Sequence, residues 1–183
     1  KIQEFLKNSP VVLDLYAGVG TIGLSVARDK DLTLVEINAS AYDELAANSK
    51  RVMAETKNSN IKPILAKSEE VLDLISSKTR VIVDPPRAGC DTSLIQKFYE
   101  IQPEKIVYLS CNPITQVRDL DLLLDFYSLE FIEGYKKAVN EFSSTKKLSD
   151  KYMAEYLNIG MIYLKNSKYI VFKIFVVISH FFW

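Results

Sequence analysis

The sequence predicts a doubly wound α/β fold, in which helices cover both faces of a mostly parallel sheet. Over the first 135 residues, short apolar runs alternate with longer amphipathic segments at least five times. The first apolar run ends in a glycine-rich turn, as in sheets that bind nucleotides. The chain has 183 residues, of which 48% are hydrophobic and 25% charged, enough for one domain with a buried core.

Five short apolar runs are predicted to be the strands of this sheet. They are residues 11–16, 32–36, 61–66, 80–84 and 105–110. Turn-forming residues end them, with Gly18 after the first run and Pro85 and Pro86 after the fourth. Residues 129–135 are predicted to form a sixth strand. Ligands of such a sheet are expected beyond the C-terminal ends of its strands.

The segments between these runs are predicted to be helices. They are residues 21–27, 40–53, 69–75, 92–101 and 114–124. Ser40 is the expected N-cap of the second, because a serine hydroxyl can accept a hydrogen bond from a free amide of the first turn. The third is expected to be short.

The pattern of alternation is lost after Tyr135, and the charge balance changes there as well. Residues 1–135 carry 15 basic and 20 acidic side chains, whereas residues 136–183 carry 8 basic and 3 acidic ones. We therefore expect one domain over residues 1–135 and a divergent segment over 136–183 that completes or flanks the sheet. The aromatic run 169–183 is too short and polar for a membrane span, which favours an edge strand over an exposed tail.

The composition also narrows the classes of function. A net charge of zero argues against binding nucleic acid through charge alone. Two cysteines, Cys90 and Cys111, cannot form a disulfide framework, and the chain begins with no secretory signal, so a reducing, cytoplasmic compartment is expected. We predict neither a metal site nor membrane contact, and the sequence does not determine the oligomeric state.

A glycine-rich turn follows the first strand and predicts a nucleotide-like ligand. Gly18, Gly20 and Gly23 let the backbone turn tightly and approach a ligand. Asp14 precedes the turn, where it can orient the loop or face a cationic part of the ligand. Glu36 ends the second strand, where a carboxylate accepts hydrogen bonds from ribose hydroxyls. The alternative is that Asp14 only caps the turn and Glu36 is a solvated strand end.

Two further motifs end the fourth and fifth strands. Asp84-Pro85-Pro86-Arg87 predicts a stiff loop that can hold a planar base, with Asp84 accepting hydrogen bonds. Cys111 follows Ser110 at the end of the fifth strand and precedes a predicted helix, a setting that lowers a thiol pKa. A buried structural cysteine is the alternative, and it is the interpretation that we give to Cys90.

Together these motifs resemble a known family. D-L-Y-A-G-V-G-T resembles motif I of class I (Rossmann-like) methyltransferases, which bind S-adenosyl-L-methionine. D-P-P-R-A-G-C-D and Y-L-S-C-N-P-I-T-Q-V-R-D-L are similar to the RNA uridine-C5 methyltransferases, which make 5-methyluridine in ribosomal and transfer RNA. The resemblance covers residues 11–135.

The resemblance implies a role for individual residues. Cys111 would be the nucleophile that adds to carbon 6 of uracil. Arg87 follows the rigid Pro-Pro turn, where its guanidinium can engage a phosphate or a base edge on the substrate side; a surface arginine paired with a nearby carboxylate is the alternative. The positions that would contact the cofactor are Asp14, Tyr16, Gly18, Gly20, Thr21, Glu36 and Asp84.

The chain also departs from the family. Members carry an N-terminal RNA-binding domain, and they end in a motif whose glutamate is the general base. Neither is recognisable here; the glutamate is expected near Thr145, and Glu141 is the nearest carboxylate. Two hypotheses follow: an active RNA methyltransferase or its catalytic half, and a cofactor-binding module that has lost catalysis.

Overall fold

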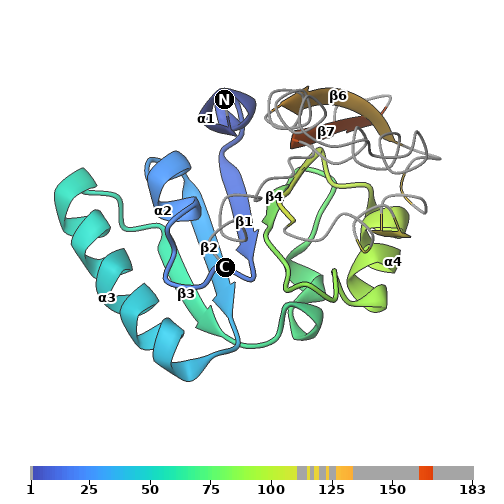
Figure 1. Cartoon of the computed structure of the whole chain (residues 1–183). Helices are drawn as coiled ribbons and strands as arrows, with labels where there is room; N and C mark the ends of the chain where they lie inside the picture. The colour runs from blue at the N-terminus through green and yellow to red at the C-terminus, as the bar shows by residue number, and fades with distance from the viewer. Residues whose placement is uncertain are drawn as a thin grey trace, which may run out of the picture.

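The chain is described by a computed structural model (Figure 1). The described residues are 2–110, 115, 118, 119 and 123, together with the backbone of residues 127–133 and 161–166. Several predicted features lie outside them, namely Cys111, Glu141, the strand over 169–183 and most of the helix over 114–124.

The described residues form a seven-stranded sheet in the order β3-β2-β1-β4-β5-β7-β6. The strands are β1 (Val11–Leu15), β2 (Asp31–Glu36), β3 (Ile61–Leu65), β4 (Arg80–Val83), β5 (Lys105–Tyr108), β6 (Tyr127–Glu133) and β7 (Met161–Asn166). The first five are parallel, and β7 runs antiparallel to both β5 and β6. The predicted doubly wound, mostly parallel sheet is therefore confirmed.

The strand order creates a switch point between β1 and β4. From β1 the chain moves outward to β2 and β3, and then crosses to the other side of β1 to form β4. Loops that leave neighbouring strands in opposite directions open a space at the C-terminal ends of those strands, where ligands of such sheets bind. The two predicted ligand-binding loops follow β1 and β4.

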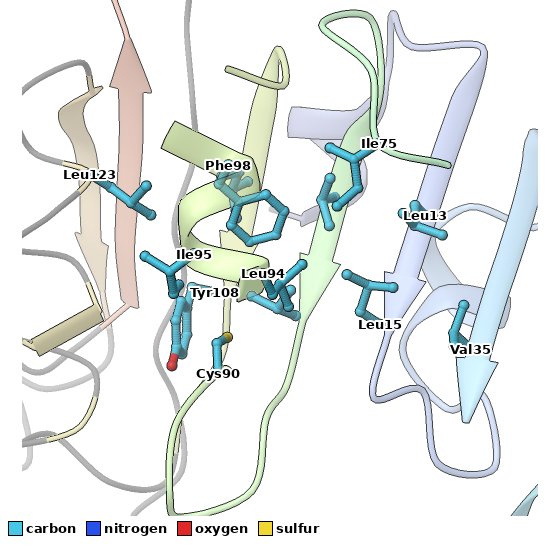
Figure 2. Close-up of a cluster of buried hydrophobic side chains, with 13 residues drawn as sticks. Leu13, Leu15, Val35, Ile75, Cys90, Leu94, Ile95, Phe98, Tyr108 and Leu123 are labelled. Carbon is cyan, nitrogen blue, oxygen red and sulfur yellow. The ribbon is translucent and has the colours of Figure 1, made fainter. Parts of the chain in front are cut away.

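The strands β1, β2, β4 and β5 are largely buried on both faces, which explains why they are rich in apolar residues. Side chains alternate between the faces: Leu13 and Leu15 point to one and Val12 to the other. Figure 2 shows the first face, where Leu94 and Phe98 of α4 (Thr92–Ile101) pack over the strands. The opposite face is covered by α1 (Ile2–Leu6), α2 (Gly23–Val26) and α3 (Ala39–Thr56).

Three predictions about helices were wrong in detail. Asn38, not Ser40, is the N-cap of α3, because its side-chain oxygen accepts the backbone N–H of Ala41 at 3.0 Å. The helix predicted over 21–27 begins only at Gly23. The short helix predicted over 69–75 is two 3₁₀ turns, Ser68–Glu70 and Leu72–Leu74, separated by Val71 in a non-helical conformation.

One further element is displaced from its predicted position, and two were not predicted. The predicted sixth strand exists as β6 and is displaced by two residues, whereas β7 was not predicted. Helix α1 was also not predicted; it is anchored by the fully buried Leu6 and by the Arg80 guanidinium, which donates to the Phe5 carbonyl. Tertiary contacts of this kind form a one-turn helix that its own sequence would not sustain.

Candidate functional site

The glycine-rich loop, residues 16–22, leaves the end of β1 and crosses the adjacent end of β2. The Ala17 N–H donates to the Val35 carbonyl at 2.9 Å, which attaches the loop to β2. Tyr16, Gly18 and Gly20 all have positive φ, at 60°, 57° and 85°. For tyrosine this conformation costs about 1–2 kcal/mol, so Tyr16 is a strained position at the start of the loop.

Two glycines of the loop have different surroundings. A Cβ on Gly20 would lie 2.6 Å from a Leu45 methyl and 2.7 Å from a Leu24 methyl, so this glycine lets α2 and α3 pack closely. A Cβ on Gly18 would have nothing within 4 Å. The Gly18 backbone therefore borders open space at the switch-point end of the sheet.

Asp14 supports the loop from inside the sheet. Its side chain is 1% exposed, and one carboxylate oxygen accepts the Gly23 N–H at 3.0 Å. Burial raises the pKa of Asp14 to about 7; the hydrogen bond from Gly23 opposes this rise, and the negative charge of Asp84 adds to it. Asp14 thus holds the start of α2 against β1 and is poised to lose or gain a proton near neutral pH.

Glu36 fixes the same loop from β2. Its two carboxylate oxygens accept the Gly18 and Asn38 N–H groups, each at 2.7 Å. A carboxylate oxygen has two lone pairs, so both oxygens can accept one further hydrogen bond. Glu36 is 9% exposed, and the next residue, Ile37, is 57% exposed.

Two exposed apolar residues next to Glu36, Ile37 and Leu65, were missed by the sequence-based prediction. Leu65 is 50% exposed and lies opposite Glu36 in the β2–β3 register. A large apolar side chain directly after an acidic strand end is the signal that could have identified Ile37. Acidic and apolar groups at one edge suit a ligand with a hydroxylated sugar and a flat ring.

The Pro-Pro loop, residues 84–91, leaves the end of β4 next to the glycine-rich loop. The Asp84 N–H donates to the Leu15 carbonyl at 3.4 Å, and the Asp91 N–H donates to the Tyr16 hydroxyl, also at 3.4 Å. Asp84 and Arg87 are exposed, as is Thr21 of the glycine-rich loop. The structure therefore brings the two predicted loops together.

Cys90 is a buried structural cysteine, as predicted, because it is 5% exposed and packs in the core under α4 (Figure 2). Burial raises the pKa of its thiol, and the nearby Asp119 raises it further. Its backbone, together with that of its neighbours, is held by Thr115, Arg118 and Asp119, to which the sequence-based prediction assigned no role.

The described part of the chain holds neither a candidate metal site nor a candidate membrane-spanning helix. There, no group of three or more His, Cys, Asp or Glu side chains is arranged to hold a metal ion. Likewise, no helix in that part is long and apolar enough to cross a membrane.

Comparison with known proteins yields a consistent set of similarities. The family model described as tRNA (uracil-5-)-methyltransferase matches residues 4–137. An uncharacterized RNA methyltransferase of Staphylococcus aureus (strain MSSA476) is 40% identical over 132 residues, which are 68% of this chain and 28% of that protein. One from Lactobacillus johnsonii is 43% identical over 122 residues, 64% of this chain and 26% of that protein.

A solved structure is similar over much of the same region. It is the tRNA (uracil-54, C5)-methyltransferase of Pyrococcus abyssi in complex with S-adenosyl-L-homocysteine. The two are 31% identical with a TM-score of 0.60, and the match covers 72% of this chain and 31% of that chain. The matched part of this chain therefore spans less than a third of the length of each of these similar proteins.

Proposed function

Because this chain belongs to the tRNA (uracil-5-)-methyltransferase family and has its class I fold, we propose that it binds S-adenosyl-L-methionine and methylates carbon 5 of uridine in RNA. Residues 1–135 are assigned to the catalytic domain, and residues 136–183 to a segment that completes or flanks the sheet. The substrate is ribosomal or transfer RNA. The observation that carries the proposal is the Glu36 carboxylate, which holds the glycine-rich loop at the switch point with acceptor capacity to spare.

The residues at the switch point fit this cofactor. The spare lone pairs of Glu36 suit the ribose hydroxyls, and the exposed Ile37 suits the adenine ring. The open space beside Gly18 admits a ligand close to the backbone. When bound, S-adenosyl-L-methionine supplies an electrophilic methyl group on a positively charged sulfonium.

The acidic groups fit the positive charge of the cofactor. Asp14 is buried, so it acts through its field and by orienting the loop, while Asp84 is exposed at the neighbouring strand end. The charge of Asp84 raises the pKa of Asp14, which means that the two carboxylates repel each other when both are ionised. A cation bound between the two loops would relieve this repulsion. Tyr16 and Thr21 lie on the same loop and complete the proposed cofactor side.

Cys111 is the proposed nucleophile on the strength of its motif. Carbon 5 of uracil is a poor nucleophile, and addition of the Cys111 thiolate to carbon 6 gives an enolate that is reactive at carbon 5. After methylation, a base removes the proton from carbon 5, the carbon 6–sulfur bond breaks and the thiolate is released. Arg87 is proposed to lie on the substrate side and to engage a phosphate or a base edge of the RNA.

Calorimetry with S-adenosyl-L-homocysteine tests the cofactor site. Glu36→Ala removes the acceptor of the Gly18 and Asn38 amides as well as the ribose acceptor, so we expect it to weaken binding by about 1–3 kcal/mol. Glu44→Ala is the matched control, because Glu44 is an exposed carboxylate on α3, and its affinity should equal that of the wild type. A folded wild-type protein that binds no ligand at millimolar concentration would contradict the proposal.

A denaturing gel tests the covalent step. The chain is incubated with a uridine-containing RNA and cofactor labelled in the methyl group. We expect a slow-migrating labelled band that is lost in Cys111→Ala and kept in Cys90→Ala, the matched control for a buried thiol. Because the family's general-base motif is not recognisable, release should be slower by about two to four orders of magnitude than in an enzyme with that base.

Two other outcomes of the gel would favour a different interpretation of the chain. Rapid release of 5-methyluridine would indicate another base, with Glu141 the first residue to substitute. Neither band nor product, from a protein that binds the cofactor, would favour a module that binds the cofactor without catalysis.

A further inference from the structure

Asp119 is a buried carboxylate with all of its hydrogen-bonding capacity filled. It is 3% exposed. One oxygen accepts the Cys90 N–H at 2.8 Å and the Tyr108 hydroxyl at 2.6 Å. The other accepts two N–H groups of Arg118, at 2.8 and 2.6 Å. An ionised carboxylate has about four acceptor positions, so these donors offset the cost of burying its charge.

Arg118 and Thr115 hold the other polar groups of the Pro-Pro loop. The Arg118 guanidinium donates to the carbonyls of Ala88 at 3.0 Å and Cys90 at 3.4 Å. The Thr115 hydroxyl donates to the Arg87 carbonyl at 3.1 Å. With the Asp119 contact, side chains from residues 115–119 bind four backbone groups between residues 87 and 90.

Gly89 shows that the Pro-Pro loop fits closely against Thr115, Arg118 and Asp119, which together are called the clamp. Its φ is +86°, and a Cβ there would lie 2.5 Å from an Arg118 nitrogen and 2.7 Å from an Asp119 oxygen. The backbone of the loop therefore rests directly on the clamping side chains. The side chains of Asp84 and Arg87 stay exposed while the backbone between residues 87 and 90 is fixed.

We propose that Thr115, Arg118 and Asp119 are positioning residues that set the conformation of the Pro-Pro loop and so aim Arg87 at the RNA. This inference rests on the proposed function and assigns part of its substrate recognition. Within the described part of the chain, the hydrogen bonds of the clamp to the loop are to backbone groups, and the side chain of Arg87 is exposed. In the sequence, these residues also follow the proposed nucleophile, Cys111, by four to eight positions. One segment therefore carries the proposed nucleophile and also holds the Pro-Pro loop.

The geometry favours positioning over a merely structural role. The Arg118 side chain is 58% exposed and yet spans Asp119 and two loop carbonyls. Ordering a long exposed side chain costs conformational entropy, and the core already packs through the apolar residues under α4. Positioning matters for rate, since displacing a reacting group by about 1 Å can slow catalysis on the order of a hundredfold.

The first test measures the loop itself by amide hydrogen exchange in the full chain. Asp119→Asn keeps the shape of the side chain but places an amide NH₂ against donors. We expect the Cys90 amide to exchange about tenfold faster. The Gly18 amide, which donates to Glu36, is the internal reference and should not change. Unchanged exchange at Cys90 would overturn the proposal.

The second test separates positioning from stability and uses Arg118→Lys. Lysine keeps the charge but lacks the planar fork that contacts Asp119 and the loop together. We expect kcat for uridine methylation, and affinity for a short uridine-containing RNA, to fall about tenfold to a hundredfold, with affinity for S-adenosyl-L-homocysteine within about twofold. Arg28→Lys is the matched control, because the Arg28–Glu55 pair, at 3.2 Å and exposed, lies outside the Pro-Pro loop.

The outcomes also distinguish this inference from the proposed function. Wild-type activity with unchanged kcat and RNA affinity in Arg118→Lys would overturn the inference alone. A parallel loss of cofactor affinity and Gly18 protection would indicate a general structural role and overturn it as well. Failure of the wild type to transfer methyl groups would count against the proposed function, while the exchange and RNA-binding comparisons still decide the positioning role.

Discussion

The glycine-rich loop and the Pro-Pro loop are both held by buried carboxylates, but the carboxylates come from different distances along the chain. Asp14 and Glu36 bind amides that are 9 and 18 residues away, within the first β-α-β unit. Asp119 binds an amide 29 residues away, on the far side of β5. The cofactor side of the proposed site is thus built locally, whereas the proposed substrate side forms only when the chain beyond β5 packs back.

The two sides also differ in how negative charge is compensated. Asp119 receives two hydrogen bonds from a guanidinium, whereas the described contacts of Asp14 comprise one backbone N–H and the repulsive charge of Asp84. The substrate side therefore carries its own counter-charge. The cofactor side instead presents an electrostatic imbalance that a cationic ligand can relieve.

The largest expected effect comes from removing the buried Asp119 carboxylate, which holds the Pro-Pro loop from beyond β5. Asp119→Ala leaves the Cys90 amide and the Tyr108 hydroxyl buried without their acceptor. We expect the free energy of unfolding in urea to fall by about 3–5 kcal/mol. Glu55→Ala, which removes the exposed pair with Arg28, should cost less than about 1 kcal/mol. Equal effects of the two substitutions would remove the contrast between the loops.

The uncompensated charge of Asp14 predicts a dependence of stability on pH. Its pKa is about 7 in the folded protein, against an ordinary value of 3.8. Between these values the folded state binds more protons, so this group's contribution to the free energy of unfolding is lost as pH rises from about 4 to 7. Asp14→Asn should flatten this slope and gain stability at pH 8 relative to the wild type, by at most about 4 kcal/mol. Parallel pH profiles for the two proteins would refute the assignment.

Comparing alanine substitutions at two glycines isolates how much the packing of the loop against the clamp contributes to stability. Gly18 and Gly89 both have positive φ, so alanine costs each about 1–2 kcal/mol through the backbone. At Gly89 the new Cβ also meets Arg118 and Asp119, whereas at Gly18 it meets open space. Gly89→Ala should therefore be less stable than Gly18→Ala by about 1–3 kcal/mol in urea unfolding. An equal loss of stability in the two variants would mean that the clamp side chains move aside at no measurable cost.

The smallest expected effect concerns the contact between the loops. The Tyr16 hydroxyl accepts the Asp91 N–H at 3.4 Å, close to the limit for a hydrogen bond. Tyr16→Phe should lower the free energy of unfolding by about 0.5 kcal/mol or less. A loss comparable to that of Asp119→Ala would show that the loops form one cooperative unit.

The sequence by itself determined the parallel sheet and the family. Strands buried on both faces must be apolar throughout, so the runs that became β1, β2, β4 and β5 were visible without knowledge of their neighbours. Helix α4 has the predicted bounds, because its amphipathic pattern and the Asp91 cap lie within one short segment. The loop motifs were also visible locally, because the glycines that a tight turn needs lie within a few consecutive residues.

Only the tertiary structure decided which groups hold those motifs in place. Either Asn38 or Ser40 can cap a helix. The position of the chain after β2 decides at which of them α3 begins. A one-turn helix such as α1 depends on Arg80, more than 70 residues away. The clamp on the Pro-Pro loop joins residues 28 to 30 positions apart. Local patterns encode the preferences of a segment, whereas the pairing of buried polar groups depends on which segments the packed core brings together.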